Sequence, residues 1–192
     1  MRDNAVVRRK YPMTKDHLLG MYRTKLNHIK LTYASLVMWS YPDMPRVFKE
    51  LHREILNSDN RGISVLFPDI ERFIDDEASL RIATEELYAS AHRAAVKELL
   101  PITKYYCNST GQLAELKAQP WFQFWRILRN CWSHDMKFNF NPDEKSKLPF
   151  VWSGVTIDIS MNGRELKHGD CSYEKIRELI EIAQRFVQNE IA

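Results

Sequence analysis

Residues 129–134 read Arg-Asn-Cys-Trp-Ser-His and bring together three side chains that suit RNA cleavage without a metal. Histidine has the unperturbed pKa nearest neutrality, so His134 can accept a proton from a ribose 2′-hydroxyl or return one to a leaving oxygen. Arg129 stays charged and can bind phosphate oxygens in pairs, which would stabilise the charge that builds on a phosphodiester. Asn130 is four positions before His134, and this spacing makes the two neighbours on a helix. Asn130 is therefore expected to hold the imidazole in one tautomer or to contact the phosphate.

The angle between Arg129 and His134 limits how they can act together. They are five positions apart in the sequence, which corresponds to roughly 140° around an α-helix. One regular helix therefore does not aim both side chains at the same atom. Either the helix frays near His134, or a second copy of the motif completes the site across a dimer interface. We favour the dimer.

An amphipathic helix over residues 120–134 must position this motif. One face of the helix collects large apolar residues, namely Trp121, Phe124, Trp125, Leu128, Cys131 and Trp132. The opposite arc is polar and carries Arg126, Arg129, Asn130, Ser133 and His134, with Phe122 and Ile127 among them or at its edge. A helix with so much tryptophan on one face is expected to be anchored in a core. Its polar arc would then be held in a fixed orientation.

At Arg129, Asn130 and His134 the chain resembles the HEPN superfamily (higher eukaryotes and prokaryotes nucleotide-binding domains). The signature of that family is an arginine, commonly followed by a polar residue, with a histidine a few positions later near the end of a late helix. The resemblance implies a metal-independent endoribonuclease that dimerises, pools two motifs in one cleft and leaves 2′,3′-cyclic phosphate ends. Arg129, Asn130 and His134 would be its catalytic residues, and no cofactor is implied. Many relatives are toxins of toxin–antitoxin pairs or phage-defence effectors, so the partners implied are a second copy, an RNA substrate and, for a toxin, an antitoxin protein.

Other interpretations of the motif stay open. A non-catalytic HEPN module would bind a nucleotide, an RNA or a protein partner through the same basic cleft. A purely structural helical dimer would bury Arg129 and His134 in ion pairs, away from any cleft. An arginine and a histidine at this spacing also occur by chance, and a polar helix face is usually no more than solvent-exposed.

Further side chains near the motif are candidate RNA contacts. Arg126 and Ser133 share its polar arc, and Lys137 follows it on a loop. On that loop Phe138 and Phe140 could stack on unpaired bases while the lysine meets a phosphate. The commoner role of such aromatics is to cover a core, so both interpretations remain.

Composition indicates one globular domain. The chain has 192 residues, of which 44% are hydrophobic and 28% charged, and its net charge of +3 permits RNA binding without requiring it. The three cysteines, Cys107, Cys131 and Cys171, are odd in number and far apart, which favours a reducing cytoplasm over a disulfide framework. No metal-ligand spacing, signal peptide or membrane-spanning apolar run is found. We therefore expect a cytoplasmic protein with no metal site and no membrane contact.

The apolar pattern predicts a mainly α protein, a HEPN-like helical bundle that forms a single domain over 1–192. Apolar steps of three and four residues predict long helices over about 14–40, 75–107 and 120–134. A last helix is expected to start at Asp170 or Ser172. Its inward face is predicted to be Ile176, Leu179, Ile180, Ala183, Phe186 and Val187.

The pattern also makes predictions about single positions in the first two of these helices. Tyr33 and Val37 continue the apolar stripe of the first helix, and Leu87 lies on the stripe of the helix over 75–107. Pro101 is expected to bend or end that helix, because proline lacks the backbone donor and clashes with the preceding turn.

Residues 155–167 predict a short β-hairpin inserted after the motif helix. Apolar and polar residues alternate from Val155 to Ile159, and Asn162-Gly163 is a strong two-residue turn. This turn sets a register with two expected cross-strand pairs, Ile159 with Leu166 and Asp158 with Lys167.

Overall fold

The computed structural model describes residues 13–57, 67 and 69–192. The absence of a signal peptide was an expectation about the first residues of the chain, and residues 1–12 lie outside this description. The elements, in chain order, are the helices α1 (Lys15–Trp39), α2 (Met44–Asn57), α3 (Ile70–Asp75), α4 (Glu77–Ser109), α5 (Leu113–Ala118), α6 (Phe122–Ser133) and α7 (Pro142–Lys145), the strands β1 (Phe150–Trp152) and β2 (Val155–Ile157), and the final helix α8 (Tyr173–Asn189). Two short 3₁₀ turns, η1 (Ile159–Met161) and η2 (His168–Asp170), precede α8. The prediction of a mainly helical protein with a small late hairpin is confirmed.

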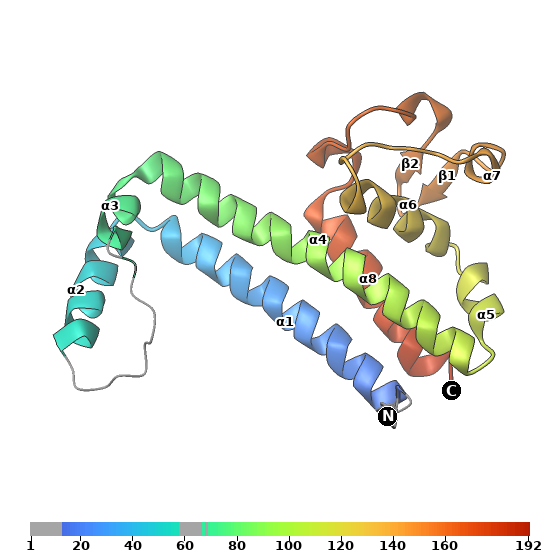
Figure 1. The fold of residues 1–192 in the computed structure, drawn as a ribbon, viewed down its shortest axis with the longest axis horizontal. Helices are drawn as coiled ribbons and strands as arrows, with labels where there is room; N and C mark the ends of the chain where they lie inside the picture. The colour runs from blue at the N-terminus through green and yellow to red at the C-terminus, as the bar shows by residue number, and fades with distance from the viewer. Residues whose placement is uncertain (1–12, 58–66, 68) are drawn as a thin grey trace, which may run out of the picture.

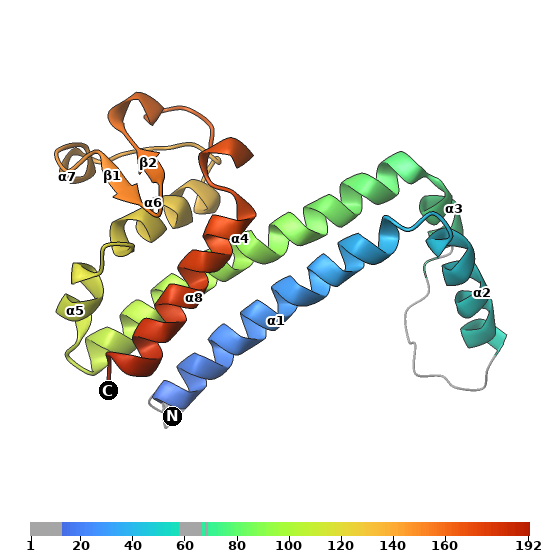
Figure 2. The same cartoon turned by 180° about the vertical axis from the view of Figure 1, so that it is seen from behind.

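Two long antiparallel helices, α1 and α4, form the axis of the molecule (Figure 1). The Tyr22 hydroxyl on α1 hydrogen-bonds the Thr103 hydroxyl near the end of α4 at 2.8 Å. Tyr33, farther along α1, has its ring 6.1 Å from that of Tyr88, earlier in α4. Helices α2 and α3 lie at one end of this pair, whereas α5, α6 and the strands lie toward the other (Figure 1). Seen from behind, α8 runs alongside α4 and α1 (Figure 2).

Local signals explain where the principal helices begin. The Thr14 hydroxyl accepts a hydrogen bond from the His17 amide at 3.2 Å, and the Ser172 hydroxyl accepts one from the Lys175 amide at 3.3 Å. Both are N-caps that satisfy a backbone donor left free by the first turn. The predicted start of the last helix at Ser172 is thus confirmed.

Of the two effects expected of Pro101, bending or ending its helix, the second is wrong. The helix α4 runs without interruption past Pro101 to Ser109, so Pro101 does not end it. Pro101 itself is exposed, whereas Leu99, Leu100 and Thr103 around it are buried in the core. Packing on both sides of the proline therefore holds the helix together despite the missing hydrogen bond.

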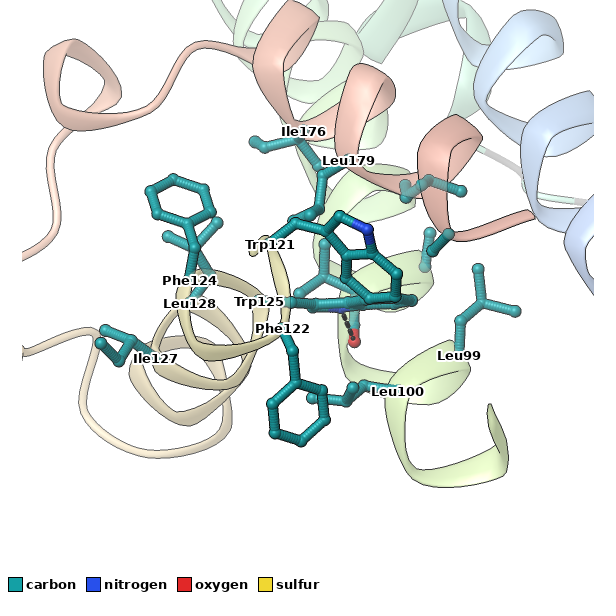
Figure 3. Packing of buried hydrophobic residues seen from close by; sticks show 14 of the residues in the cluster. Leu99, Leu100, Trp121, Phe122, Phe124, Trp125, Ile127, Leu128, Ile176 and Leu179 are labelled. Carbon is teal, nitrogen blue, oxygen red and sulfur yellow. Dashed lines mark hydrogen bonds between the residues drawn. The ribbon is translucent and has the colours of Figure 1, made fainter. Parts of the chain in front are cut away.

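The core lies where α4, α6 and α8 meet. Trp121 and Trp125 are 1% and 0% exposed, and the Trp125 indole donates to the Val96 carbonyl on α4 at 3.0 Å. Figure 3 shows this bond and, on the side of α6 away from α4, the side chains of Phe124 and Leu128. The Phe124 ring packs on Trp152 of β1, with centroids 5.2 Å apart. All six residues predicted for the inward face of α8 are buried: Ile176, Leu179, Ile180, Ala183, Phe186 and Val187. The burial of Trp121 and Trp125 confirms the prediction that tryptophan anchors the motif helix in the core.

The far ends of α1 and α4 are less covered than their periodicity predicted. Tyr33 and Val37 are 56% and 52% exposed, and Leu87 is 43% exposed. These three residues were expected to face inward, and that expectation was wrong. The α8 helix packs on α1 and α4 near the opposite end of the pair (Figures 1 and 2). The apolar stripes of α1 and α4 are therefore helical, but α8 does not cover them at this end.

The predicted hairpin register is wrong, although a hairpin exists. The strands β1 and β2 pair Phe150 with Ile157 and Trp152 with Val155. Their turn is Ser153-Gly154, with φ of 48° and 79°, the pair of positive values that suits a tight hairpin turn. The two cross-strand pairs expected over 155–167, Ile159 with Leu166 and Asp158 with Lys167, do not form in this sheet.

The Asn162-Gly163 turn lies beside a different pairing, between residues 162–166 and the segment after the motif helix. Asp158 ends the strand by accepting a hydrogen bond from the Ser160 amide at 2.8 Å, which starts the turn η1. After Gly163 the chain pairs with the segment that follows the motif: the Phe138 amide donates to the Arg164 carbonyl at 2.9 Å. The Asn162 side chain also accepts from the Phe140 amide at 3.0 Å. The chain after the motif helix is thereby held against residues 162–166.

No helix within the described part of the chain combines the length and the apolar character needed to cross a bilayer.

Candidate functional site

The motif lies at the carboxyl end of α6. The helix ends at Ser133, and His134 has φ −119° and ψ −125°, which is outside the helical region. Beyond it the Met136 amide donates to the Cys131 carbonyl at 3.1 Å and closes the helix end. Because His134 lies past the last helical residue, the 140° separation from Arg129 expected for a regular helix does not apply. The chain does leave the helix at His134, but this departure does not bring Arg129 into the pocket beside His134.

The motif side chains remain accessible in the single chain. His134 is exposed, whereas Arg129 and Asn130 are half-buried. The Arg129 guanidinium donates to the Asn130 side-chain oxygen at a long 3.4 Å. Among the described residues neither Arg129 nor His134 forms an ion pair. A purely structural motif was expected to bury both residues in ion pairs, and this chain does not do so.

A pocket of about 150 Å³ opens beside His134. It is formed by the last turns of α6 and by the segment that follows, and its lining is Ile127, Asn130, Cys131, His134, Lys137, Asn139, Phe140 and Glu144. Of the six predicted site residues it brings together Asn130, His134 and Lys137. Arg126, Arg129 and Ser133 do not line it. Among the described residues, Arg129 hydrogen-bonds Asn130, which does line the pocket.

Two polar residues of the pocket, Asn139 and Glu144, were not among the predicted site residues. Glu144 is the buried one. Its side chain is 2% exposed and its Oε1 lies 2.9 Å from the Arg126 Nη2, without the alignment of a hydrogen bond. Its other oxygen accepts from the Asn141 amide, and the Asn141 side chain accepts from the Glu144 amide, each at 2.9 Å. This reciprocal capping box could have been recognised from the Asn-x-x-Glu spacing. The position of Glu144 against Arg126 could not be recognised from the sequence, because these two residues belong to different helices.

Arg126 is therefore not a free cation on the polar arc. The ion pair with Glu144 occupies part of the guanidinium, and its Nε and Nη2 atoms are buried. Ser133 is half-buried beside the helix end. Lys137, in contrast, is exposed and lines the pocket. Of the three predicted RNA contacts, Lys137 is the one best placed to meet a phosphate near His134.

The aromatics of the loop face the core. Phe138 and Phe140 are 0% and 4% exposed, with ring centroids 5.8 Å apart. The Arg164 guanidinium lies 5.6 Å from the centre of the Phe138 ring, which suits a cation–π contact. Open-faced stacking of these two rings on bases is thus not available, and the core-covering interpretation is confirmed. Phe140 still contributes to the pocket wall.

The cysteine within the motif is an inert wall residue. Burial raises the pKa of the Cys131 thiol to about 12, so the thiol stays protonated and is a poor nucleophile at neutral pH. The polar chemistry of the pocket therefore comes from one imidazole, two amides, one ammonium group and one buried carboxylate. Within the described ranges, no three His, Cys, Asp or Glu side chains gather as metal ligands.

A larger hollow of about 540 Å³ lies at the other end of the molecule, lined by parts of α1, α3 and α4 such as Trp39, Ile74 and Leu80. It includes none of the predicted site residues. The pocket at the end of α6 is smaller but carries the titratable and polar groups.

Comparisons of this chain with protein-family models, curated proteins and solved structures found no match.

Proposed function

We propose that this protein is a metal-independent endoribonuclease of the HEPN type that acts in the cytoplasm. The observation that carries the proposal is the arrangement of His134 and Asn130, which line one open pocket at the end of α6. An exposed imidazole beside an amide and a lysine is suited to transfer a proton near a phosphate.

In the proposed reaction the ribose 2′-oxygen attacks the adjacent phosphorus and its proton passes to His134. A new P–O bond closes the 2′,3′-cyclic phosphate while the bond to the 5′-oxygen of the next nucleotide breaks. The protonated His134, or its counterpart in the second copy, gives a proton to that leaving oxygen, which becomes a hydroxyl. Arg129 would stabilise the charge on the non-bridging oxygens, and Asn130 would orient the imidazole or the phosphate.

A homodimer accounts for the position of Arg129. This residue does not line the pocket beside His134 of its own chain, so a second copy of the motif would supply the phosphate clamp. Light scattering in solution checks the oligomeric state, and a strict monomer would contradict the shared site.

The proposal is tested with RNA and two matched histidine variants in the presence of a chelator. His134→Ala should reduce the cleavage rate by about 10²- to 10⁴-fold. His28→Ala replaces another exposed histidine, on α1, and should cleave as the parent does. Equal rates for the parent and for His134→Ala would disprove the mechanism.

A non-catalytic HEPN module is the second candidate function. The pocket favours it to the extent that amides and an exposed lysine also suit the simple binding of a nucleotide or RNA. Expression in growing cells separates the two. A toxin or phage-defence ribonuclease should slow growth, and His134→Ala should relieve that effect. Equal growth with both proteins would favour the binding module, with an RNA or a protein such as an antitoxin as its partner.

A further inference from the structure

The pocket beside His134 has the size and lining of a site for a single ring. Its volume is about 150 Å³, and a cavity of about 150 Å³ in another protein accommodates benzene. The apolar part of the lining is Ile127, Cys131 and Phe140. A flat ring fits such a surface, whereas a two-ring purine needs more room.

The charges around the pocket favour a neutral ligand over a phosphate in its interior. The Glu144 carboxylate lies in the wall with its side chain 2% exposed. The carbonyl end of α6 also faces this region and carries partial negative charge. Arg126 offsets the carboxylate but does not line the pocket. A group that offers N–H donors is therefore attracted, and the exposed Lys137 can hold a phosphate at the rim.

Two amides supply the means to recognise the edge of a base. Asn130 and Asn139 line the pocket from α6 and from the segment after it. Among the described residues the Asn139 side chain makes no hydrogen bond, and Asn130 makes only the long one to Arg129. Each amide carries both a donor and an acceptor. Unpaired RNA bases are commonly recognised through such contacts to their Watson–Crick edge.

We propose that this pocket binds one unpaired cytosine of the RNA, next to the bond that is cut. Cytosine has a single ring, an exocyclic amino group that donates, and two acceptors. Uracil has the same size, but a carbonyl oxygen replaces that amino group and its one donor is the ring N3–H, so it offers one N–H to the electronegative wall where cytosine offers two. The inference rests on the proposed function for the identity of the ligand as RNA, and its own content is the base preference.

Two readouts separate this inference from the proposed function. The probes are short oligoadenylates that carry one central cytidine, uridine, guanosine or abasic residue. Cleavage is measured with the parent protein, and equilibrium binding of the same probes is measured with His134→Ala. Cytidine should be preferred over uridine and guanosine by about ten-fold in both assays, because one well-formed base contact discriminates by this order.

Substitution of Asn139 tests the pocket directly. Asn139→Ala removes an amide, and Asn139→Trp fills the pocket from an exposed position. Both should abolish the preference for cytidine, and Asn27→Ala, which changes an exposed asparagine on α1, should retain it. Circular dichroism confirms that each variant is folded.

The outcomes are distinct. Cleavage without base preference would overturn the cytosine site and leave the nuclease proposal standing. Binding that prefers cytidine without any cleavage would overturn the nuclease proposal and leave the cytosine site standing. A preference for uridine or a purine, or a cytidine preference that survives Asn139→Trp, would overturn the inference. Loss of both cleavage and binding would overturn both proposals.

Discussion

The carboxylate of Glu144 lies 2.9 Å from the guanidinium of Arg126 and is almost wholly buried. Arg126 belongs to α6, whereas Glu144 belongs to α7, which follows the motif and the loop after it. The pair therefore joins the motif helix to the segment that forms the outer wall of the pocket. Such a contact fixes the shape of the pocket, because both sides of it must move together.

Breaking this pair should destabilise the protein. Glu144→Gln removes the charge but keeps an oxygen for the Asn141 amide, and it leaves the partly buried Arg126 without a counter-ion. We expect a loss of about 2 kcal/mol in the free energy of unfolding, less than for a fully buried pair because Arg126 is 26% exposed. Urea denaturation measures this loss.

A double-mutant cycle provides the control for that prediction. Arg126→Met together with Glu144→Gln should cost less than the sum of the two single changes, because neither charge is then left alone. Additive losses would mean that the two side chains do not stabilise each other.

Protonation of His92 should weaken the fold at mildly acidic pH. Its ring is buried against Tyr88 and Tyr173. Burial lowers the pKa of His92, a hydrogen bond to the Tyr88 carbonyl opposes that shift, and the charge of Arg177 adds to it. The unfolded chain therefore takes up a proton near pH 6.5 that the folded chain does not. Above about pH 7 His92 is neutral in both states and does not lower the free energy of unfolding. As the pH drops, this free energy falls by at most about 1.4 kcal/mol per pH unit because of His92.

Urea denaturation between pH 7 and pH 5 measures the effect, with His92→Gln as the comparison. The parent should lose more stability than the variant over this range. Parallel profiles for the two proteins would show that the ring of His92 gains its proton as readily in the folded chain as in the unfolded one.

The cysteines should resist alkylation while the protein is folded. Burial raises the pKa of Cys107 to about 11 and those of Cys131 and Cys171 to about 12. Since the thiolate is the reactive form, iodoacetamide should leave the native protein unmodified at mildly basic pH. After unfolding in urea all three cysteines should react, and mass spectrometry distinguishes the states. Rapid labelling of native Cys131 would contradict the burial of its thiol in the pocket wall.

Two glycines should respond in opposite ways to alanine. Gly154 has φ of 79° in the hairpin turn, so Gly154→Ala should cost about 1–2 kcal/mol of stability. Gly20 lies within α1, and a β-carbon there would meet nothing within 4 Å. Gly20→Ala should therefore stabilise the protein by about 0.5–1 kcal/mol. Thermal denaturation of both variants measures the contrast, and a stabilising Gly154→Ala would show that the turn does not require a positive φ.

The sequence alone was sufficient for features that depend on neighbouring residues. The period of the apolar residues identified the buried face of α8 and the tryptophan-rich face of α6, because a helix brings positions three and four apart to one side. The caps at Thr14 and Ser172 were readable for the same reason, since a cap and the amide it satisfies lie within one turn.

Tertiary structure decided the features that depend on distant partners. Asn162-Gly163 is a turn on local grounds, yet which segment pairs beside it depended on the chain after the motif, at Phe138 and Phe140. The exposure of Tyr33 depended on where α8 packs. In the same way, the burial of Glu144 against Arg126 required α7 to fold back onto α6. Spacing in a sequence specifies the face of an element, but only packing determines what that face meets.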